Sequence, residues 1–513
     1  MQFKFTKFAT ALIVSGIVSL PLIAHANDSS ELEELRALVQ QLDQKIKVLD
    51  RKNELAEEAA AIRKQETPVI TSNQDKYNSG FGIQSADGQN KIQFGGLVQL
   101  DNRQYPSANE GNTSGFDVRR IRPIVQGTLD GIYDFKFAPE YGDNKVASSS
   151  TNGGIADAFV NARFKPWLQV QAGKFAPDVG LERLESSNFN KFIELSTISN
   201  NFVPNRDIGV SLHGDIINNK LYYAVGLYQG VVDGGDSITS QSYNGNNEYS
   251  ARVFATPFKG DDSVLAGLGF GIAATHDNGT GSDIASTSYA STGASTGIVA
   301  NSGLPGYKTP GQESTFFAYN ATTSASGNRN RVTPQAYFYY GPFGVIAEYA
   351  RVSQNVSGVL DGGSLTGARS SADLHNNAWE ITGSWLLTGE NATHNKPVSP
   401  NSPFSTNGGG WGAWELVARF QETNIDQNAY AYAAKGTSLT TSSVNTTTLL
   451  NSSTAGIEAQ SAKTWGLGVN WYLSKNLKLA TNYEVTSFNS FAGQTGTIRP
   501  DEKFIDSRLQ LAF

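Results

Sequence analysis

The chain has 513 residues, no cysteine and a formal net charge of −7. The absence of cysteine excludes a disulfide framework and thiolate metal sites, and the acidic balance disfavours a nucleic-acid-binding protein. Glycine (52 residues) and aromatic side chains (11%) are plentiful, whereas charged residues are sparse (17%). This mixture is typical of strands and turns rather than of helices.

Residues 1–26 have the features of a secretory signal peptide. Lys4 and Lys7 give a positive start, the stretch 9–20 is mostly apolar, and 24–26 reads Ala-His-Ala, a small-residue cleavage site. The apolar stretch is short for a membrane span, although an uncleaved anchor helix is the alternative. No later segment is apolar enough for a transmembrane helix, so an exported chain of this kind is either soluble and extracytoplasmic or a β-barrel.

Residues 27–67 contain a heptad pattern. Apolar positions follow one another at alternating spacings of three and four, ending in two weaker members: Leu32, Leu35, Val39, Leu42, Ile46, Leu49, Asn53 and Ala56. This seam predicts a periplasmic α-helical coiled coil that begins near Ser29 or Ser30 and ends before Pro68. The β-branched residues at the a positions favour two strands, although a barrel can impose another number, and a single helix docked elsewhere is the alternative. Residues 68–90 are expected to be a linker.

From residue 91 to the end the hydrophobic period is two, which predicts an outer-membrane barrel over 91–513. We expect sixteen strands, at 91–101, 117–129, 132–142, 155–165, 167–175, 207–215, 220–230, 248–257, 264–276, 331–340, 343–353, 376–388, 412–424, 463–473, 476–486 and 503–513. An even number is the rule in single-chain bacterial barrels. The run around Phe316 and Phe317 is therefore left in a loop, because a seventeenth strand would place the two termini on opposite sides.

The strands carry one apolar and one polar face. In the last strand Leu509 and Leu511 share a face with Phe513, whereas Arg508 and Gln510 lie on the other face. An apolar outside and a polar inside fit an all-β transmembrane barrel, because only a closed sheet leaves no backbone group unpaired in hydrocarbon. Short and long connections alternate, with one exception at 389–411. A soluble β-sandwich also has alternating strands, but it does not require this alternation of turn lengths.

Arginines gather in the second expected strand. Arg120 and Arg122 have inward parity, whereas Arg119 has the opposite parity but lies near the strand end. Guanidinium groups stay charged and bind phosphate or carboxylate in bidentate fashion. Their partners are expected to be Asp117, Asp157 or a passing anion, and a purely structural network of charges across the lumen is the alternative reading.

Catalytic motifs are missing from the sequence. The five histidines lack metal-ligand spacing, and there is neither a G-x-S-x-G nor a phosphate-cradling P-loop. We therefore predict that the protein is not an enzyme, and we predict no cofactor and no metal site.

Several motifs resemble those of the phosphate-selective porins O and P, from about residue 78 to the C-terminus. They are GFGIQSADG at 80–88, RRIRP at 119–123, FKFAPEYG at 135–142, ADAF at 156–159, GKF at 173–175, GLERL at 180–184, VPNRD at 203–207, LTGE at 387–390 and GGWGAWE at 409–415. The last two bracket the exceptional connection. Together these matches are specific, although none would be so alone.

The resemblance implies a sixteen-stranded homotrimeric porin of the bacterial outer membrane, with the loop 176–206 folded inward to narrow the pore. It implies an arginine-lined constriction that passes anions, which in the best-known members is phosphate. By motif position Arg119 and Arg120 match the family's central arginine pair, and Lys174 matches its central lysine. Strand parity puts Lys174 on the doubtful face unless a bulge follows Gly173. Asp157 is the expected acidic counterpart.

The predicted function is passive diffusion of small anions, phosphate or polyphosphate favoured, across the outer membrane. The predicted partners are two further copies of the chain, outer-membrane lipid, the anionic solutes, and the assembly machinery that reads a terminal aromatic residue such as Phe513. Alternatives are a barrel that acts mainly as a periplasmic tether, a porin for organic acids or other small solutes, and a barrel enzyme.

Overall fold

The computed structural model describes residues 29–66, 69–72, 81–106, 114–142, 154–237, 247–278, 303–311, 315–319, 323–359, 369–431, 458–491 and 499–513. The expected signal peptide at 1–26 lies outside the described residues. The chain divides into two compact units between Thr67 and Pro68.

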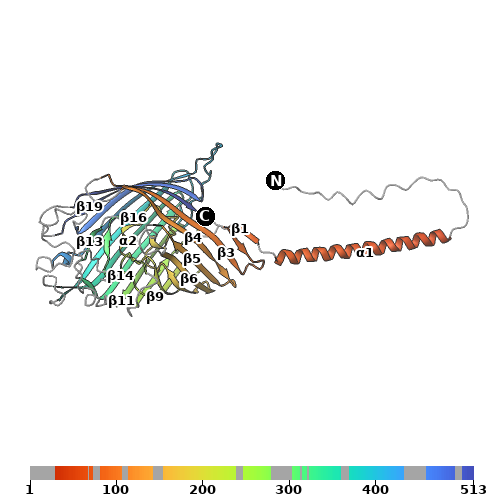
Figure 1. Cartoon of the computed structure of the whole chain (residues 1–513), viewed down its shortest axis with the longest axis horizontal. Helices are drawn as coiled ribbons and strands as arrows, with labels where there is room; N and C mark the ends of the chain where they lie inside the picture. The colour runs from red at the N-terminus through yellow and green to blue at the C-terminus, as the bar shows by residue number, and fades with distance from the viewer. Residues whose placement is uncertain are drawn as a thin grey trace, which may run out of the picture. The chain divides into compact units, whose positions relative to one another are not determined.

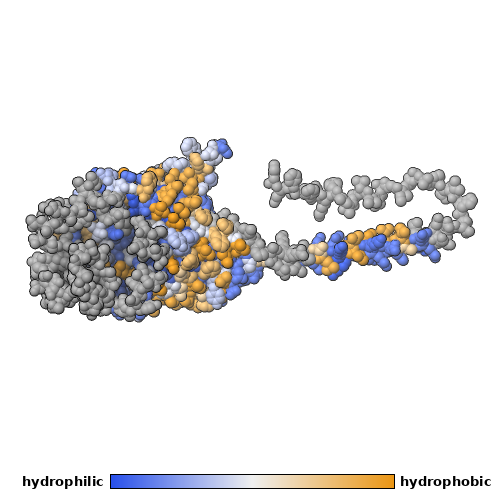
Figure 2. All heavy atoms as spheres, viewed as in Figure 1, coloured by the Kyte–Doolittle hydropathy of each residue, from blue (hydrophilic) through white to orange (hydrophobic). Residues whose placement is uncertain are grey.

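The first unit contains one long helix, α1 (Ser29–Glu66). Its apolar seam residues Val39, Leu42, Ile46 and Leu49 are all more than half exposed, and Figure 2 shows apolar residues running along the helix beside hydrophilic ones. A helix that leaves such a stripe in water is stabilised when another surface covers it. Within the described part of the chain, no helix is long and apolar enough to cross a membrane.

The second unit is a closed antiparallel β-barrel (Figure 1). Its wall consists of the sixteen predicted strands. They are β3 (Lys91–Gln104), β4 (Gly115–Leu129), β5 (Tyr133–Glu140), β6 (Gly154–Lys165), β7 (Leu168–Phe175), β8 (Asp207–Ile216), β9 (Leu221–Tyr228), β10 (Glu248–Ala255), β11 (Leu268–Asp277), β14 (Ser324–Tyr340), β15 (Phe343–Val359), β16 (Arg369–Leu386), β17 (Ala413–Asn424), β18 (Ser461–Tyr472), β19 (Leu477–Asn489) and β20 (Glu502–Ala512). Each pairs with the next, and β20 pairs with β3 to close the ring.

The described remainder consists of short elements. They are β1 (Val69–Ser72), β2 (Phe81–Gln84), β12 (Gly306–Lys308), β13 (Thr315–Ala318), the 3-10 turns η1 (Glu182–Leu184) and η2 (Val264–Gly267), and the helices α2 (Thr197–Asn201) and α3 (Asn428–Ala431). Phe316 and Phe317 belong to β13, which pairs only with β12 in a separate small sheet. The run is therefore not a strand of the barrel, as expected, but it forms a short strand where a loop was predicted.

Two strands lie within the expected linker 68–90. β20 pairs with residues 97–104 of β3, which leaves the start of that edge without a partner. β2 fills this place by pairing with residues 91–94, and β1 in turn pairs with β2. The backbone groups of β3 are thus satisfied beyond the point where the last strand ends.

Three strands run further than their hydrophobic pattern predicts. β15 has 17 residues, or about 56 Å at roughly 3.3 Å per residue, whereas about 9–11 residues suffice to cross a bilayer. In the added ends of β14, β15 and β16 the pattern is reversed: Val356 and Leu374 are fully buried on the inward face, whereas Asn355 and Asp373 lie on the outward face. A strand that has left the bilayer needs no apolar outer face. Residues 264–267 were expected in a strand and form η2 instead.

Side-chain exposure confirms the two faces. In β18 the outward Trp465 and Leu467 are 43% and 56% exposed, whereas the inward Thr464 and Asn470 are 1% and 0% exposed. Figure 2 shows apolar residues gathered on the visible outer wall of the barrel. The polar side chains therefore face a lumen, where they meet one another and the loops that enter it.

The last residue takes part in closing the barrel. Phe513 exchanges two backbone hydrogen bonds with Gly96, at 2.8 and 3.0 Å. A Cβ at Gly96 would meet the Phe513 ring at 2.8 Å, so the glycine lets the ring cross the neighbouring strand.

Removal of Phe513 is expected to lower the amount of assembled barrel in the outer membrane several-fold, because the two backbone hydrogen bonds to Gly96 and the terminal aromatic side chain are lost together. Phe513→Trp keeps the backbone hydrogen bonds and an aromatic side chain, and it should assemble like the wild type. The measurement is the heat-modifiable protein in outer-membrane fractions, with conductance of the inserted channels as a check that the pore is unaltered. An unchanged yield of the truncated chain would refute the expectation.

Candidate functional site: an arginine cluster facing the inward loop

The loop 176–206 lies inside the barrel, as the resemblance implied. Its η1 and α2 contribute to a run of buried residues, and Figure 1 shows α2 within the ring of strands. Inward side chains of several strands donate hydrogen bonds to its carbonyls: Gln335 to Val179, Gln99 to Ser187, Gln510 to Asn188, Lys478 to Asn190, Asn470 to Lys191 and Arg419 to Glu194. The loop is thus tied to both sides of the lumen and narrows it.

The exceptional connection 389–411 packs against the same loop. His394 Nδ1 lies 2.9 Å from Glu185 Oε1, and the backbone N–H of Ser186 donates to Asn395 Oδ1 at 3.0 Å. The His394 ring stacks on Tyr337 with 4.3 Å between ring centroids. This connection therefore supports the loop from the short-turn end of the barrel.

A β-bulge brings Arg119 and Arg120 to the same face. Gln99 on β3 pairs with Arg120, but Asp101, two residues further, pairs with Asp117, three residues away on β4. The extra residue on β4 resets the alternation of side chains. The parity reading that turned Arg119 outward is therefore wrong, because it assumed an uninterrupted ladder.

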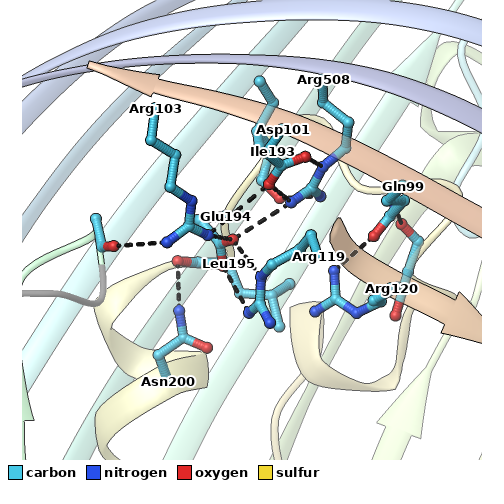
Figure 3. A network of polar contacts seen from close by, with 12 residues as sticks. Gln99, Asp101, Arg103, Arg119, Arg120, Ile193, Glu194, Leu195, Asn200 and Arg508 are labelled. Atoms are coloured by element: carbon cyan, nitrogen blue, oxygen red, sulfur yellow. Dashed lines mark hydrogen bonds and ion pairs between the residues drawn. The ribbon is translucent and has the colours of Figure 1, made fainter. Parts of the chain in front are cut away.

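Three guanidinium groups converge on Glu194 of the inward loop (Figure 3). Its carboxylate accepts from Arg119 Nε at 2.8 Å, Arg103 Nη2 at 2.9 Å and Arg508 Nη2 at 3.3 Å. Burial opposes ionisation of this carboxyl, but the three nearby positive charges outweigh it and hold the pKa of Glu194 below its ordinary value. Arg508 also grips both oxygens of Asp101, each at 2.6 Å.

Arg120 differs from its neighbours. Its Nη1 donates to Gln99 Oε1 at 2.7 Å, and the side chain stays partly exposed. Gln99 is fully buried and also bonds Ser187 of the loop, so Arg120 lies on the lumen face. Among the residues that the structure describes, no carboxylate forms an ion pair with Arg120. It is therefore the member of the cluster with capacity for a solute.

The other three predicted residues belong to separate ion pairs. Arg122 binds Glu140 through Nε at 3.0 Å and Nη2 at 2.5 Å. Asp157 pairs with Lys136 at 2.8 Å and Arg206 at 3.5 Å. Asp157 is thus not the ion-pair partner of the arginines on β4. Arg122 pairs with Glu140 on the adjacent strand, and Arg119 pairs with Glu194 on the loop.

Lys174 points inward through the conformation of Gly173. Its Nζ lies 2.9 Å from Asp236 Oδ1 and donates to the Ser237 carbonyl. The pairing of β7 shows no inserted residue at this point. Instead Gly173 has φ +134°, and this backbone conformation turns the side chain of Lys174 toward the lumen. Any side chain at position 173 would collide with the carbonyl oxygen of Ala158. The inward position of Lys174 is real, but the expected bulge is not its cause.

Sequence reasoning missed Arg103, Asp101 and Glu194 as members of the site. Arg508 and Asp101 are opposite each other in the register of β20 and β3, so pairing the first barrel strand with the last would have placed them together. The position of Glu194 has no such signal, because it depends on the path of a loop through the lumen.

Three carboxylates of the cluster lie close enough to hold one cation. Ligand atoms of Asp101, Glu194 and Asp506 are all within 4.8 Å of one another, and carboxylate oxygens suit hard metal ions. Two of the three carboxylates already have arginine partners: Asp101 pairs with Arg508, and Glu194 pairs with Arg103, Arg119 and Arg508. The arrangement therefore favours internal ion pairing over a bound cation.

A closed sixteen-stranded barrel with an apolar outer wall, a charged lumen and a loop folded into it defines an outer-membrane porin, a channel protein. The family model for "Phosphate-selective porin O and P" matches residues 92–513, and the chain belongs to that family. Porin O of Pseudomonas aeruginosa is 21% identical over 453 residues, which cover 85% of this chain and 92% of the relative.

Solved porins resemble the chain at low sequence identity. OprB of Pseudomonas putida is 10% identical, with a TM-score of 0.49 over 83% of this chain and 95% of its own. The anion-selective porin from Comamonas acidovorans is 10% identical, with a TM-score of 0.47 over 83% of this chain and 100% of its own.

The start of the inward loop offers a test of its role. Glu348 on β15 accepts the backbone N–H groups of Leu181 at 2.5 Å and Glu182 at 2.9 Å. Glu348→Ala would leave both groups buried without an acceptor, at a cost of about 1–3 kcal/mol each. We expect a lower unfolding midpoint and a larger, noisier single-channel conductance.

Glu348→Gln keeps one acceptor oxygen and should show the smaller effect. Planar-bilayer recordings and urea unfolding in lipid vesicles provide the measurements. An alanine variant with the conductance noise and stability of the wild type would show that these two bonds do not hold the loop.

Proposed function

We propose that the protein mediates passive diffusion of small anions, with phosphate or polyphosphate favoured, through a constriction that contains Arg119, Arg120, Arg122, Asp157 and Lys174. The observation that carries the proposal is Arg120, a lumen-facing guanidinium without an ion-paired carboxylate among the described residues. Membership of a phosphate-selective porin family supports the choice of solute.

A guanidinium in a narrow passage acts on anions in two ways. Its planar fork of N–H donors matches two oxygens of a phosphate or carboxylate, and its charge acts strongly where water is partly excluded. Gln99 holds one edge of Arg120, which fixes the direction of the fork. Conduction also requires release, and a guanidinium without an ion-paired carboxylate beside compensated ones suits transient binding.

The remaining residues of the site have supporting roles in this proposal. Arg119 adds positive charge next to Arg120 although Glu194 accepts its hydrogen bonds. The pairs of Arg122 with Glu140 and of Lys174 with Asp236 keep the wall polar without adding net charge. Selection by charge therefore depends on a small number of uncompensated groups.

Arg120→Ala is expected to reduce the anion preference and to weaken block of the chloride current by phosphate. A hydrogen bond to a charged group contributes roughly 1.5–3 kcal/mol, so affinity should fall about tenfold or more at low salt, and the difference should shrink as salt screens the field. Arg120→Lys should keep part of the preference but lose phosphate affinity, since lysine lacks the planar fork.

The matched control is the double variant Arg163→Gln with Asp134→Asn, which removes an ion pair of the barrel wall that includes none of the constriction residues and leaves the net charge unchanged. It should bind phosphate like the wild type. Currents in chloride, phosphate and a dicarboxylate distinguish a phosphate channel from a channel for organic acids. A cation-selective wild type, or an alanine variant that binds and conducts unchanged, would refute the proposal.

We also propose a homotrimer in which α1 forms a coiled coil with its copies, in a mature chain of a periplasmic segment 27–67 and a barrel 91–513 that follows a cleaved signal at 1–26. Support comes from the heptad seam, whose described apolar members remain exposed within one chain. The barrel itself is expected to form trimers through its own wall.

Changing Leu35, Leu42 and Leu49 to Ser should melt the coiled coil, because the d positions then lose their apolar contacts. Serines at Gln40, Gln41 and Gln44, away from the seam, form the matched control and should leave it folded. Loss of helical circular dichroism with retention of oligomers in mild detergent is the expected result. Monomers after loss of the helix would show that the barrel does not trimerise by itself.

A further inference from the structure

We propose that Glu194 is a specificity-determining residue: its carboxylate occupies the arginine cluster as an internal substitute for a solute anion and thereby limits how tightly the pore binds multivalent oxyanions. This inference rests on the proposed function, because it concerns the affinity of the same anion path. It differs from that function in assigning a role to an acidic residue of the loop.

The geometry around Glu194 is that of a bound oxyanion. Its two oxygens accept four hydrogen bonds from three guanidinium groups: Arg119 Nε and Nη2, Arg103 Nη2 and Arg508 Nη2. Convergent charge-assisted donors of this kind are what a phosphate or carboxylate solute requires. Glu194 is 2% exposed, so a solute cannot share these donors while the side chain stays in place.

The loop does not depend on this side chain for its position. The Glu194 carbonyl accepts from Arg419 Nη1 at 2.9 Å, the Ile193 carbonyl accepts from Arg508 Nη1 at 2.6 Å, and the Ile193 N–H donates to Asn482 at 2.7 Å. These three bonds involve the main chain of the loop and remain when the carboxylate is changed. The side chain of Glu194 is therefore available for tuning charge.

Charge compensation within the cluster identifies the solute class. Asp101 binds Arg508 with both oxygens but lies 3.8 Å from Arg103 Nη2. Without the negative charge of Glu194, Arg103 and Arg119 lose their ion pairs with this residue and stand beside Arg120, which has no ion-paired carboxylate among the described residues. Several adjacent guanidinium groups favour an anion with two or more charges, such as hydrogen phosphate, pyrophosphate or a dicarboxylate, over chloride.

The test is Glu194→Gln in the full-length porin, recorded in planar bilayers at low salt. We expect the anion-to-cation permeability ratio to rise and the block of chloride current by phosphate to become about tenfold tighter, with a larger gain for pyrophosphate. Glu194→Asp keeps the charge and should stay near the wild type. Heat-modifiable migration confirms that each variant is a folded barrel, and Glu194→Met repeats the test if the glutamine variant does not assemble.

The matched control is Glu182→Gln. Glu182 is also buried, lies on the same loop and pairs with a wall arginine, Arg419, but it does not contact Arg103, Arg119 or Arg120 in the described structure. It should leave phosphate affinity within about twofold of the wild type. Unchanged or weaker phosphate block in Glu194→Gln, or an equal gain in Glu182→Gln, would overturn the proposal.

The two proposals fail separately. If Arg120→Ala behaves as the wild type while Glu194→Gln still tightens phosphate block, the anion path uses the other arginines and the role of Glu194 stands. If Arg120→Ala weakens block but Glu194→Gln leaves it unchanged, the anion channel stands and Glu194 is only part of the loop.

Discussion

Backbone pairing around a closed ring is the constraint on which the rest of this structure depends. In hydrocarbon an unpaired N–H or carbonyl costs several kcal/mol, so the sheet can have no free edge. β20 meets β3 across more than 400 positions of sequence, and β2 completes the stretch of β3 that the last strand does not reach. With the backbone satisfied in this way, the side chains alone distinguish the outside from the lumen.

The charged side chains that face the lumen must be paired with groups of opposite charge. Large numbers of buried charges are tolerable only when each has partners, and most inward arginines here do: Arg122 with Glu140, Arg331 with Asp233, Arg419 with Glu182 and Arg508 with Asp101. Among the described residues, Arg120 and Arg252 are exceptions, because each donates to a glutamine side chain and forms no ion pair with a carboxylate. The local charge of the lumen wall at these positions therefore does not follow from the net charge of the chain, which is negative.

The sequence predicted the architecture well because every strand of a barrel in lipid needs an apolar outer face and a polar inner face, which gives a hydrophobic period of two. All sixteen strands followed from alternation and turn lengths. The far ends of β14, β15 and β16 did not, because there the outward face is polar and the apolar side chains, such as Val356 and Leu374, pack inward. The site was predicted less completely. Alternation misplaced Arg119 because of the bulge on β4, and no local pattern reports that Glu194 crosses the lumen to reach Arg119.

The bulge on β4 makes the number of lumen-facing arginines sensitive to a change of one codon. It places two residues of β4, Val118 and Arg119, opposite one residue of β3, Leu100, so consecutive arginines reach the same side of the wall. Loss of one residue between 117 and 120 would restore a regular ladder, and only one guanidinium of that pair would then face the water. A deletion of one residue would thus change the number of arginines on the lumen wall and leave the strand order unchanged.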